Sequence, residues 1–202
     1  MSIYAIGDIH RNIPTYEKIC KNLHKVDENV ITIQVGDVGI GFEGVEMPSL
    51  HANDYFIAGN HDDAEKCKLH PNCLGDYGVK EFDGKTVFYL RGAYSTDRDM
   101  RIPGISWWEY EELNYEQLCN AIKLYDESRP DIVITHDCPT IARTKMFGYR
   151  HSGRTVPALQ NMFEIHQPPV WAFGHHHRQL HTSIYGTYFY CIGEMQNKKI
   201  SP

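Results

Sequence analysis

Five short apolar stretches of this chain each run into residue types that commonly bind metals. This pattern restricts the fold more than any other feature of the sequence. The stretches read IYAI-GDIH, ITIQV-GD, YFIA-GNHD, IVI-THD and VWAF-GHHH. Short apolar runs rich in β-branched residues are typical of buried strands. In open α/β sheets, ligands bind beyond the carboxyl ends of parallel strands. We therefore expect the Asp, Asn and His side chains that follow these strands to gather along one edge.

Helical and hairpin patterns lie between and after these strands. Residues 15–24, opened by Pro14, and residues 114–127, which stop before Pro130, predict helices. Residues 86–90 predict another strand, and residues 181–192 predict a hairpin around Gly186. Strands that alternate with helices pair in parallel through crossovers, whereas a hairpin adds antiparallel pairs. We therefore expect an α/β fold with mixed sheets, in which residues 75–110 form strands joined by long loops.

Length and composition predict a single domain over residues 1–202, since no repeat, linker or low-complexity tract divides the chain. The net charge of -6 argues against a broad nucleic-acid surface, although it leaves a local basic patch open. No apolar stretch approaches the ~20 residues of a membrane span, and the start MSIYAIGDIH lacks the pattern of a secretory signal. The six cysteines form no C-x-x-C pair. We therefore expect free thiols in a cytoplasmic protein.

Each motif also has a simpler explanation when it is taken alone. Asp8 could cap the following helix, and Asp37 and Asn60 could be ordinary turn residues. His136 could be a satisfied polar residue at a strand end, and the three histidines at 175–177 could form a surface cluster. In an extended backbone, however, His175 and His177 share a face, whereas His176 points away. The occurrence of all five motifs together favours one shared metal site.

The ligand set combines imidazoles, carboxylates and one amide oxygen, with no obvious thiolate. Such a set suits manganese, iron or zinc, and it argues against a structural zinc site built on cysteine. The candidates are too many for one ion but suit two ions that share a carboxylate; they are Asp8, His10, Asp37, Asn60, His136, His175 and His177. Two ions ~3.5–4 Å apart can hold a bridging hydroxide and stabilise a displacement at phosphorus. Such a centre is net positive and attracts phosphate.

The motif series resembles that of the calcineurin-like metallophosphoesterase superfamily, which reads D-x-H, G-D, G-N-H-D/E, H and G-H-x-H. All five motifs occur here in the same order, between positions 8 and 177. The resemblance implies a four-layer αββα sandwich with two mixed β-sheets face to face and helices outside. It also implies a dimetal site at the carboxyl ends of the strands.

The resemblance further implies a role for each matching residue. The first metal would take Asp8, His10 and His177, and the second would take Asn60, His136 and His175, with Asp37 bridging them. His61 would be the catalytic histidine, which assists the leaving-group oxygen, and Asp62 would orient or support it. The predicted cofactors are two divalent ions, with manganese preferred and iron, zinc or nickel as alternatives.

Two departures from the family pattern narrow the expected activity. The Ser/Thr phosphoprotein phosphatases of the superfamily continue G-D with x-x-D-R-G, but here Asp37 is followed by Val38-Gly39-Ile40-Gly41. Asp62 also replaces their Glu. The sequence therefore disfavours a phosphoprotein phosphatase and leaves phosphate binding to other residues. The candidates are Arg11 and a basic group in the expected loop after His136. This group could instead be a solvated loop and helix face; it consists of Arg143, Lys145, Arg150, His151 and Arg154.

The predicted function is a metal-dependent phosphatase or phosphodiesterase that acts on a small phosphorylated or nucleotide-like substrate. A nuclease acting on DNA or RNA is an alternative, with nucleic acid as substrate only. A non-catalytic metal-binding scaffold is another, although it would not need His61 and the complete ligand set. Residues 94–108 hold Trp107 and Trp108; they could stack on a ring of the substrate, but packing under a loop is the favoured interpretation. The choice between monoester and diester, and the oligomeric state, stay open.

Overall fold

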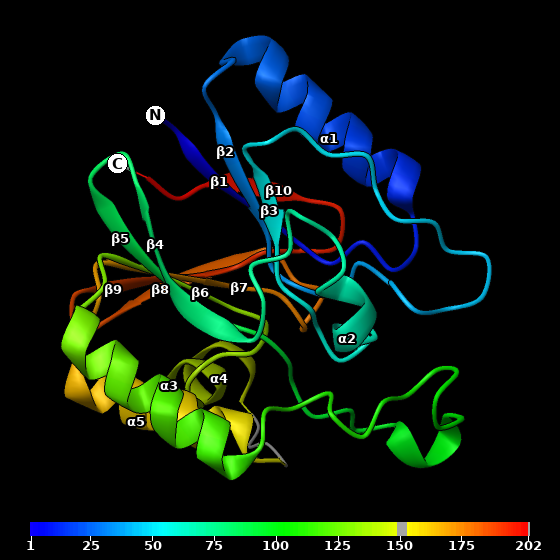
Figure 1. Cartoon of the computed structure of the whole chain (residues 1–202). Coiled ribbons are helices and arrows are strands. Elements are labelled where there is room, and N and C mark those ends of the chain that lie inside the picture. The colour runs from blue at the N-terminus through cyan, green and yellow to red at the C-terminus, as the bar shows by residue number, and fades with distance from the viewer. Residues whose placement is uncertain (149–152, 202) are drawn as a thin grey trace.

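Two mixed β-sheets pack face to face, and helices cover their outer faces (Figure 1). This computed structural model describes residues 1–148 and 153–201. Its four layers confirm the predicted αββα sandwich. The smaller sheet has the order β10-β1-β2-β3, with β10 antiparallel to β1 and the others parallel. Its strands are β1 (Ile3–Ile6), β2 (Ile31–Gln34), β3 (Asp54–Phe56) and β10 (Asn197–Lys199).

The larger sheet has the order β4-β5-β6-β7-β9-β8. Its inner strands β5, β6, β7 and β9 run parallel, whereas β4 and β8 pair antiparallel with their neighbours. Its strands are β4 (Tyr77–Phe82), β5 (Lys85–Leu90), β6 (Ile132–Thr135), β7 (Val170–Phe173), β8 (Leu180–Ile184) and β9 (Thr187–Cys191). The hairpin predicted around Gly186 is β8–β9, so that prediction is confirmed.

The space between the sheets is filled by the aliphatic residues that the sequence places in the strands. Ile3 and Ile33 from the smaller sheet meet Ile134 and Ala172 from the larger one. Every residue of β2 and β6 is buried, as expected for parallel strands that are covered on both faces. The two sheets therefore share one hydrophobic core, which holds the carboxyl ends of their strands side by side.

Helix α1 (Ile13–Val26) covers the smaller sheet and buries Tyr16 and Cys20, which lie one turn apart. The Asn12 side chain caps its first turn by accepting from the backbone of Thr15. The larger sheet is covered by helices α3 (Tyr115–Ser128), α4 (Thr140–Phe147) and α5 (Thr155–Ile165). Both predicted helices are thus present, with boundaries that differ by one or two residues.

The segment after His136 is helical where a loop was expected, so the prediction was wrong for Arg143 and Lys145, which lie in α4. Pro139 precedes the first turn of α4, and Ala142 and Met146 of this helix pack against the core of the larger sheet. Basic residues interrupt the apolar pattern of this helix, which is why the pattern did not reveal it. A short helix, α2 (Ala64–Cys67), follows β3 and was also not predicted.

A long segment, residues 91–114, connects β5 to α3 and extends away from both sheets (Figure 1). Its regular part is one turn of 3₁₀ helix, η1 (Arg98–Met100). This agrees with the expectation of long loops between residues 75 and 110. Within the described ranges, no helix has both the length and the hydropathy that crossing a bilayer requires.

Candidate metal centre

The ends of four parallel strands meet at one edge of the sandwich. Asp8 and Asp37 follow β1 and β2 of the smaller sheet, and His136 and His175 follow β6 and β7 of the larger one. Hydrogen bonds join the two sheets here. The ring Nδ1 of His136 donates to the carbonyl of Val35 at 2.7 Å, and the backbone N–H of His175 donates to both carboxylate oxygens of Asp8, at 3.1 and 3.0 Å. The predicted ligands are therefore positioned by contacts between the sheets.

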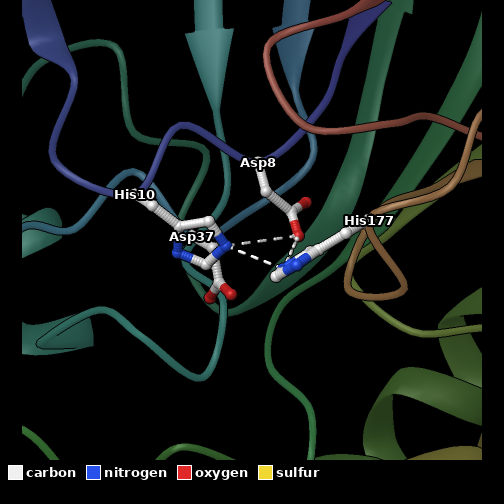
Figure 2. Close-up of side chains that lie close together, drawn as sticks. All are labelled: Asp8, His10, Asp37 and His177. Atoms are coloured by element: carbon white, nitrogen blue, oxygen red, sulfur yellow. Dashed lines mark hydrogen bonds and ion pairs between the residues drawn. The ribbon is translucent and has the colours of Figure 1, made fainter.

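The first group of converging side chains consists of Asp8, His10, Asp37 and His177. One potential ligand atom from each lies within 4.8 Å of the others, and Figure 2 shows Asp8, His10 and His177 pointing toward one another. The Nε2 atoms of His10 and His177 are 2.7 Å apart. The Asp8 Oδ2 lies 3.2 Å from the His177 Nε2. Two imidazoles and two carboxylates in this arrangement form a donor set that suits a divalent transition metal.

The second group consists of Asp37, His136 and His175, again with ligand atoms within 4.8 Å of one another. A backbone carbonyl can only accept a hydrogen bond, so the bond to Val35 places a proton on the His136 Nδ1. The opposite atom, Nε2, faces the Asp37 Oδ1 at 3.2 Å and the Asn60 Oδ1 at 3.0 Å. In the neutral ring, three electron-rich atoms therefore face one another. A cation at this point would relieve their repulsion, so the residues fit a second metal that shares Asp37 with the first.

The charges in the second group also favour a cation. Although burial opposes it, the nearby Asp37 carboxylate raises the pKa of His136 to about 10. Burial likewise opposes the charged form of Asp37, but the positive field of His136 holds the pKa of that carboxyl well below its usual range. Burial lowers the pKa of His175 to about 3. Positive charge is therefore stabilised beside His136 and Asp37 but not on the His175 ring, which stays neutral as a metal ligand must.

The backbone at the site is held in an uncommon conformation. The φ angles of His10, Asp37, His175 and His177 are +46°, +63°, +65° and +52°. A left-handed conformation costs a residue with a Cβ roughly 1–2 kcal/mol, and such strain clusters at functional sites. Four of the proposed ligands thus lie at sharp backbone turns, which direct their side chains toward one another.

Two glycines allow this close approach. A Cβ on Gly59 would lie 2.1 Å from the Asp37 Oδ1, and a Cβ on Gly174 would lie 2.2 Å from the Asp8 Oδ1. Neither residue has a φ angle that requires glycine. Their role is therefore to leave room for the two carboxylates.

His61 lies beside both groups on the loop that follows β3. Its backbone N–H donates to the Asp37 Oδ1 at 2.7 Å, and its ring lies edge-on to that of His10, with centroids 5.1 Å apart. Burial lowers the pKa of His61, and the Arg101 guanidinium adds to this effect while Asp37 opposes it. The ring borders a cavity of about 460 Å³ that Asn60 and His175 also line. A substrate in this cavity would contact His61 and both groups.

Asp62 supports the loops and does not point to the cavity. It is fully buried and accepts backbone hydrogen bonds from Gly59 at 2.8 Å, Gly39 at 2.6 Å, Ile40 at 2.9 Å and Val38 at 3.2 Å. One carboxylate therefore ties the loop after β2 to the loop after β3.

We expect Asp62→Ala to lower the free energy of unfolding by about 3 kcal/mol, because several buried N–H groups would lose a charged acceptor. Urea denaturation measures this change. The neighbouring Asp63 caps the short helix α2, so Asp63→Ala is a matched control with an expected loss of about 1 kcal/mol. Equal losses in the two variants would contradict the special role of Asp62.

The structure adds a hydrogen-bonded chain that orients Asn60. The Asn60 Nδ2 donates to the Ser95 Oγ at 3.0 Å, and the Ser95 hydroxyl donates to the Glu111 carboxylate, which also accepts from the Ser95 N–H at 2.9 Å. Because the amide nitrogen is bound on this side, the amide oxygen faces His136. Nothing in the sequence indicated Ser95 or Glu111, which come from the long 91–114 segment.

We expect Ser95→Ala to lower the metal affinity of the second position by about 10–100-fold, the usual effect of removing a hydrogen-bond partner of a ligand. The Asn60 amide would then lose the contact that fixes which of its atoms faces the metal. Metal titration of the apoprotein reports both positions, and the first should keep its affinity. Ser128→Ala, at the end of α3, removes a hydroxyl that is remote from the site and serves as the control. Equal weakening of both positions would contradict the proposed orientation of Asn60.

The candidate phosphate-binding residues lie in different places. Arg143 lines the cavity of about 460 Å³, but its Nη1 donates to the Asp137 Oδ2 at 2.8 Å. The Lys145 Nζ donates to the carbonyl of Ser183, and Arg154 donates to the carbonyls of Glu112 and Leu113. Neither residue lines this cavity. Arg11 is exposed and lines a different cavity, of about 240 Å³, and Arg150 and His151 lie outside the described residues.

Asp137 is a buried residue at the site that the sequence analysis did not assign, although it follows His136 directly. Its carboxylate lies 3.2 Å from the His176 Nε2, and it also binds Arg143. His176 therefore binds outside the two groups and stacks on Phe147 with centroids 4.0 Å apart. The extended backbone on which the prediction for His176 rested was wrong, because His175 and His177 have left-handed φ angles. Trp108 is buried and packs edge-on against Phe42, with centroids 5.4 Å apart, which agrees with the packing interpretation for this tryptophan.

Comparison with known proteins places the chain in a family. The sequence profile of the calcineurin-like phosphoesterases matches residues 1–179. No curated protein sequence matches the chain.

Three solved structures share the fold at low identity. The phosphopantetheinyl hydrolase of Mycobacterium tuberculosis is 12% identical with a TM-score of 0.53, over 96% of this chain and 90% of that one. A putative 5′-nucleotidase of Staphylococcus aureus is 12% identical with a TM-score of 0.55, over 99% of this chain and 52% of that one. The NAD nucleotidase of Haemophilus influenzae is 13% identical with a TM-score of 0.51, over 97% and 45%.

These likenesses to solved structures bear on the fold alone, and the family profile goes further because it covers most of the chain and all five motifs. Members of this family hydrolyse phosphate esters with divalent metal ions, and the two groups of side chains that share Asp37 are candidate metal sites. The chain therefore belongs to the calcineurin-like phosphoesterase family and is a metallophosphoesterase.

Proposed function

We propose that the enzyme hydrolyses a small phosphorylated or nucleotide-like substrate at a dinuclear centre. The observation that carries this proposal is the pair of ligand groups that share Asp37 beside the cavity that His61 borders. Asp8, His10 and His177 would hold the first ion, and Asn60, His136 and His175 the second. We further propose that residues 1–202 act as one domain, since both sheets contribute ligands.

When bound, the two ions would activate the water nucleophile and neutralise charge on the phosphate oxygens. The chain itself has three tasks. Asp37 aligns the two groups, and its carboxylate also holds the backbone of His61. Asp8 accepts a hydrogen bond from the backbone of His175 and so holds the end of β1 beside the end of β7. His61 would donate a hydrogen bond or a proton to the leaving-group oxygen.

We propose manganese as the preferred ion, with iron, zinc or nickel as alternatives. In the two groups that share Asp37, the donors are imidazole nitrogens and carboxylate oxygens without thiolates, and Asn60 adds one amide oxygen. A nucleotide-like substrate agrees with the nucleotidase activities named for two of the structural neighbours. A nuclease has less support, because Lys145 and Arg154 bind carbonyls away from the cavity.

The test uses protein stripped of metal by a chelator and reloaded separately with Mn²⁺, Fe²⁺, Zn²⁺ or Ni²⁺. Each form is assayed with p-nitrophenyl phosphate, its bis ester, a panel of nucleotides, and single- and double-stranded DNA and RNA. We expect release of phosphate or of the alcohol from a small substrate with Mn²⁺, and none from the stripped protein. Failure to hydrolyse any of the small substrates with every metal would contradict the proposal, and exclusive cleavage of nucleic acid would favour the nuclease.

A further inference from the structure

The long 91–114 segment brings Arg101 to the centre, a residue of the 94–108 region to which the sequence assigned no role. Arg101 follows η1, and its Nη2 lies 2.5 Å from the Nε2 of His61. The same Nη2 lies 2.7 Å from the Asp97 carboxylate, which holds the guanidinium from the other side. A residue 40 positions away from His61 in the chain therefore reaches the same ring that faces the ligand groups.

The Arg101 side chain is 9% exposed, although its charge favours water. Its second terminal nitrogen, Nη1, is buried and has no hydrogen-bond partner in the residues that the structure describes. A buried donor without a partner is uncommon, because removing it from water costs free energy. The Arg101 guanidinium therefore keeps a donor that an acceptor atom of a ligand, or an ordered water, would complete.

The location of Arg101 indicates which ligand this is. Arg101 and His61 line the cavity of about 460 Å³ that Asp37, Asn60 and His175 also line. The same two side chains also line a second cavity of about 240 Å³, which is bordered by His10 and Arg11. The Arg101–His61 pair thus lies between two cavities, each of which is also lined by proposed metal ligands. A phosphate bound at the metals would meet the guanidinium at this boundary.

We propose that Arg101 binds a terminal oxygen of the substrate phosphate, an inference that rests on the proposed function. Its planar guanidinium has donors to spare for a phosphate after it binds Asp97. Arg101 would supply the phosphate contact that the absent D-R-G motif leaves open. Of the described arginines considered from the sequence, Arg154 binds backbone carbonyls and Arg11 lines only the smaller cavity. Arg143 lines the larger cavity, where it binds Asp137, whereas Arg101 lines both.

The proposal is tested with inorganic phosphate as the probe, because its binding can be measured without turnover. Calorimetry on the manganese-loaded protein gives the Kd for phosphate. We expect Arg101→Ala to raise this Kd by roughly 10–100-fold, the usual effect of losing a hydrogen bond between charged groups. We also expect a raised KM, and partial recovery of phosphate binding when guanidinium ions are added to the variant.

Arg98→Ala is the matched control. Arg98 belongs to the same segment, but it is exposed, lies over the Tyr94 ring and pairs with the exposed Asp99. We expect this variant to bind phosphate as the unchanged protein does. Elemental analysis and thermal melting show whether each variant keeps its metals and its fold. Arg101→Lys, which keeps the charge but loses the planar fork, provides a second measurement if Arg101→Ala does not fold, with a smaller expected rise in Kd.

An unchanged phosphate Kd in a folded, metal-loaded Arg101 variant would overturn the inference. This outcome is distinct from failure of the proposed function. If the unchanged protein hydrolysed no ester but bound phosphate through Arg101, only the proposed function would fail. If it hydrolysed esters while the Arg101 variants bound phosphate normally, only the role of Arg101 would fail.

Discussion

Substitution Asp37→Asn is expected to remove both metal ions at concentrations that saturate the unchanged protein. Asp37 belongs to both ligand groups, and the substitution replaces a charged carboxylate with a neutral amide. Changes in residues that merely support a ligand lower metal affinity by about 10–100-fold, so the loss of a shared ligand should exceed the upper end of this range. Elemental analysis after gel filtration measures the bound metal, and kcat/KM at limiting Mn²⁺ should fall with it.

The backbone should tolerate this change, because asparagine adopts the left-handed conformation of Asp37 more readily than most residues. Asp83→Asn is the matched control. Asp83 also has a left-handed φ, of +50°, but it is half exposed and lies in the turn between β4 and β5. This variant should keep both ions. Loss of one ion alone from Asp37→Asn would show that the carboxylate does not bridge the two positions.

Substitution His61→Ala is expected to lower kcat by ~10²–10⁴, the usual contribution of a general acid, while both metals stay bound. The ring is not among the proposed ligands, and the backbone N–H that donates to Asp37 remains. The leaving group should determine the size of the loss. An alkyl phosphate needs a proton on the departing oxygen far more than p-nitrophenyl phosphate does, so the alkyl ester should suffer the larger loss.

His181→Ala removes an exposed imidazole from β8 and should leave kcat unchanged. Metal analysis of the His61 variant is the necessary second measurement. An equal loss for both esters would assign His61 a role other than protonation, and a loss of metal would assign it a role in the ligand shell.

The strands and the residues after them were predictable because they depend on local patterns. A buried strand needs only a short apolar run, and β1, β2, β6 and β7 each have one. Helix α3 was equally clear, because residues 114–127 are amphipathic and Pro130 follows its end. The structure adds that Asn114 and Gln117 form a capping box. Helix α4 was not predicted, because charged residues break its apolar pattern.

The candidate site likewise has a part that the sequence predicted and a part that it did not. The types and the order of the proposed ligands could be predicted from the sequence, because each ligand follows a strand and the fold aligns the strand ends. The chain from Asn60 through Ser95 to Glu111 was not readable, and neither was the contact between His61 and Arg101. These contacts join side chains 16 to 40 positions apart, through a segment with almost no regular structure.

By itself, then, the sequence determined that this protein would align aspartates, histidines and an asparagine along one edge of an α/β sandwich. Only the tertiary structure decided which side chains orient these residues, such as Ser95 at Asn60, and which arginine reaches His61. The physical reason is that strand formation follows from the burial of adjacent apolar residues, which a local pattern records. The path of the 91–114 segment instead depends on long-range contacts of individual side chains, such as that of Ser95 with Asn60, and no local pattern records these.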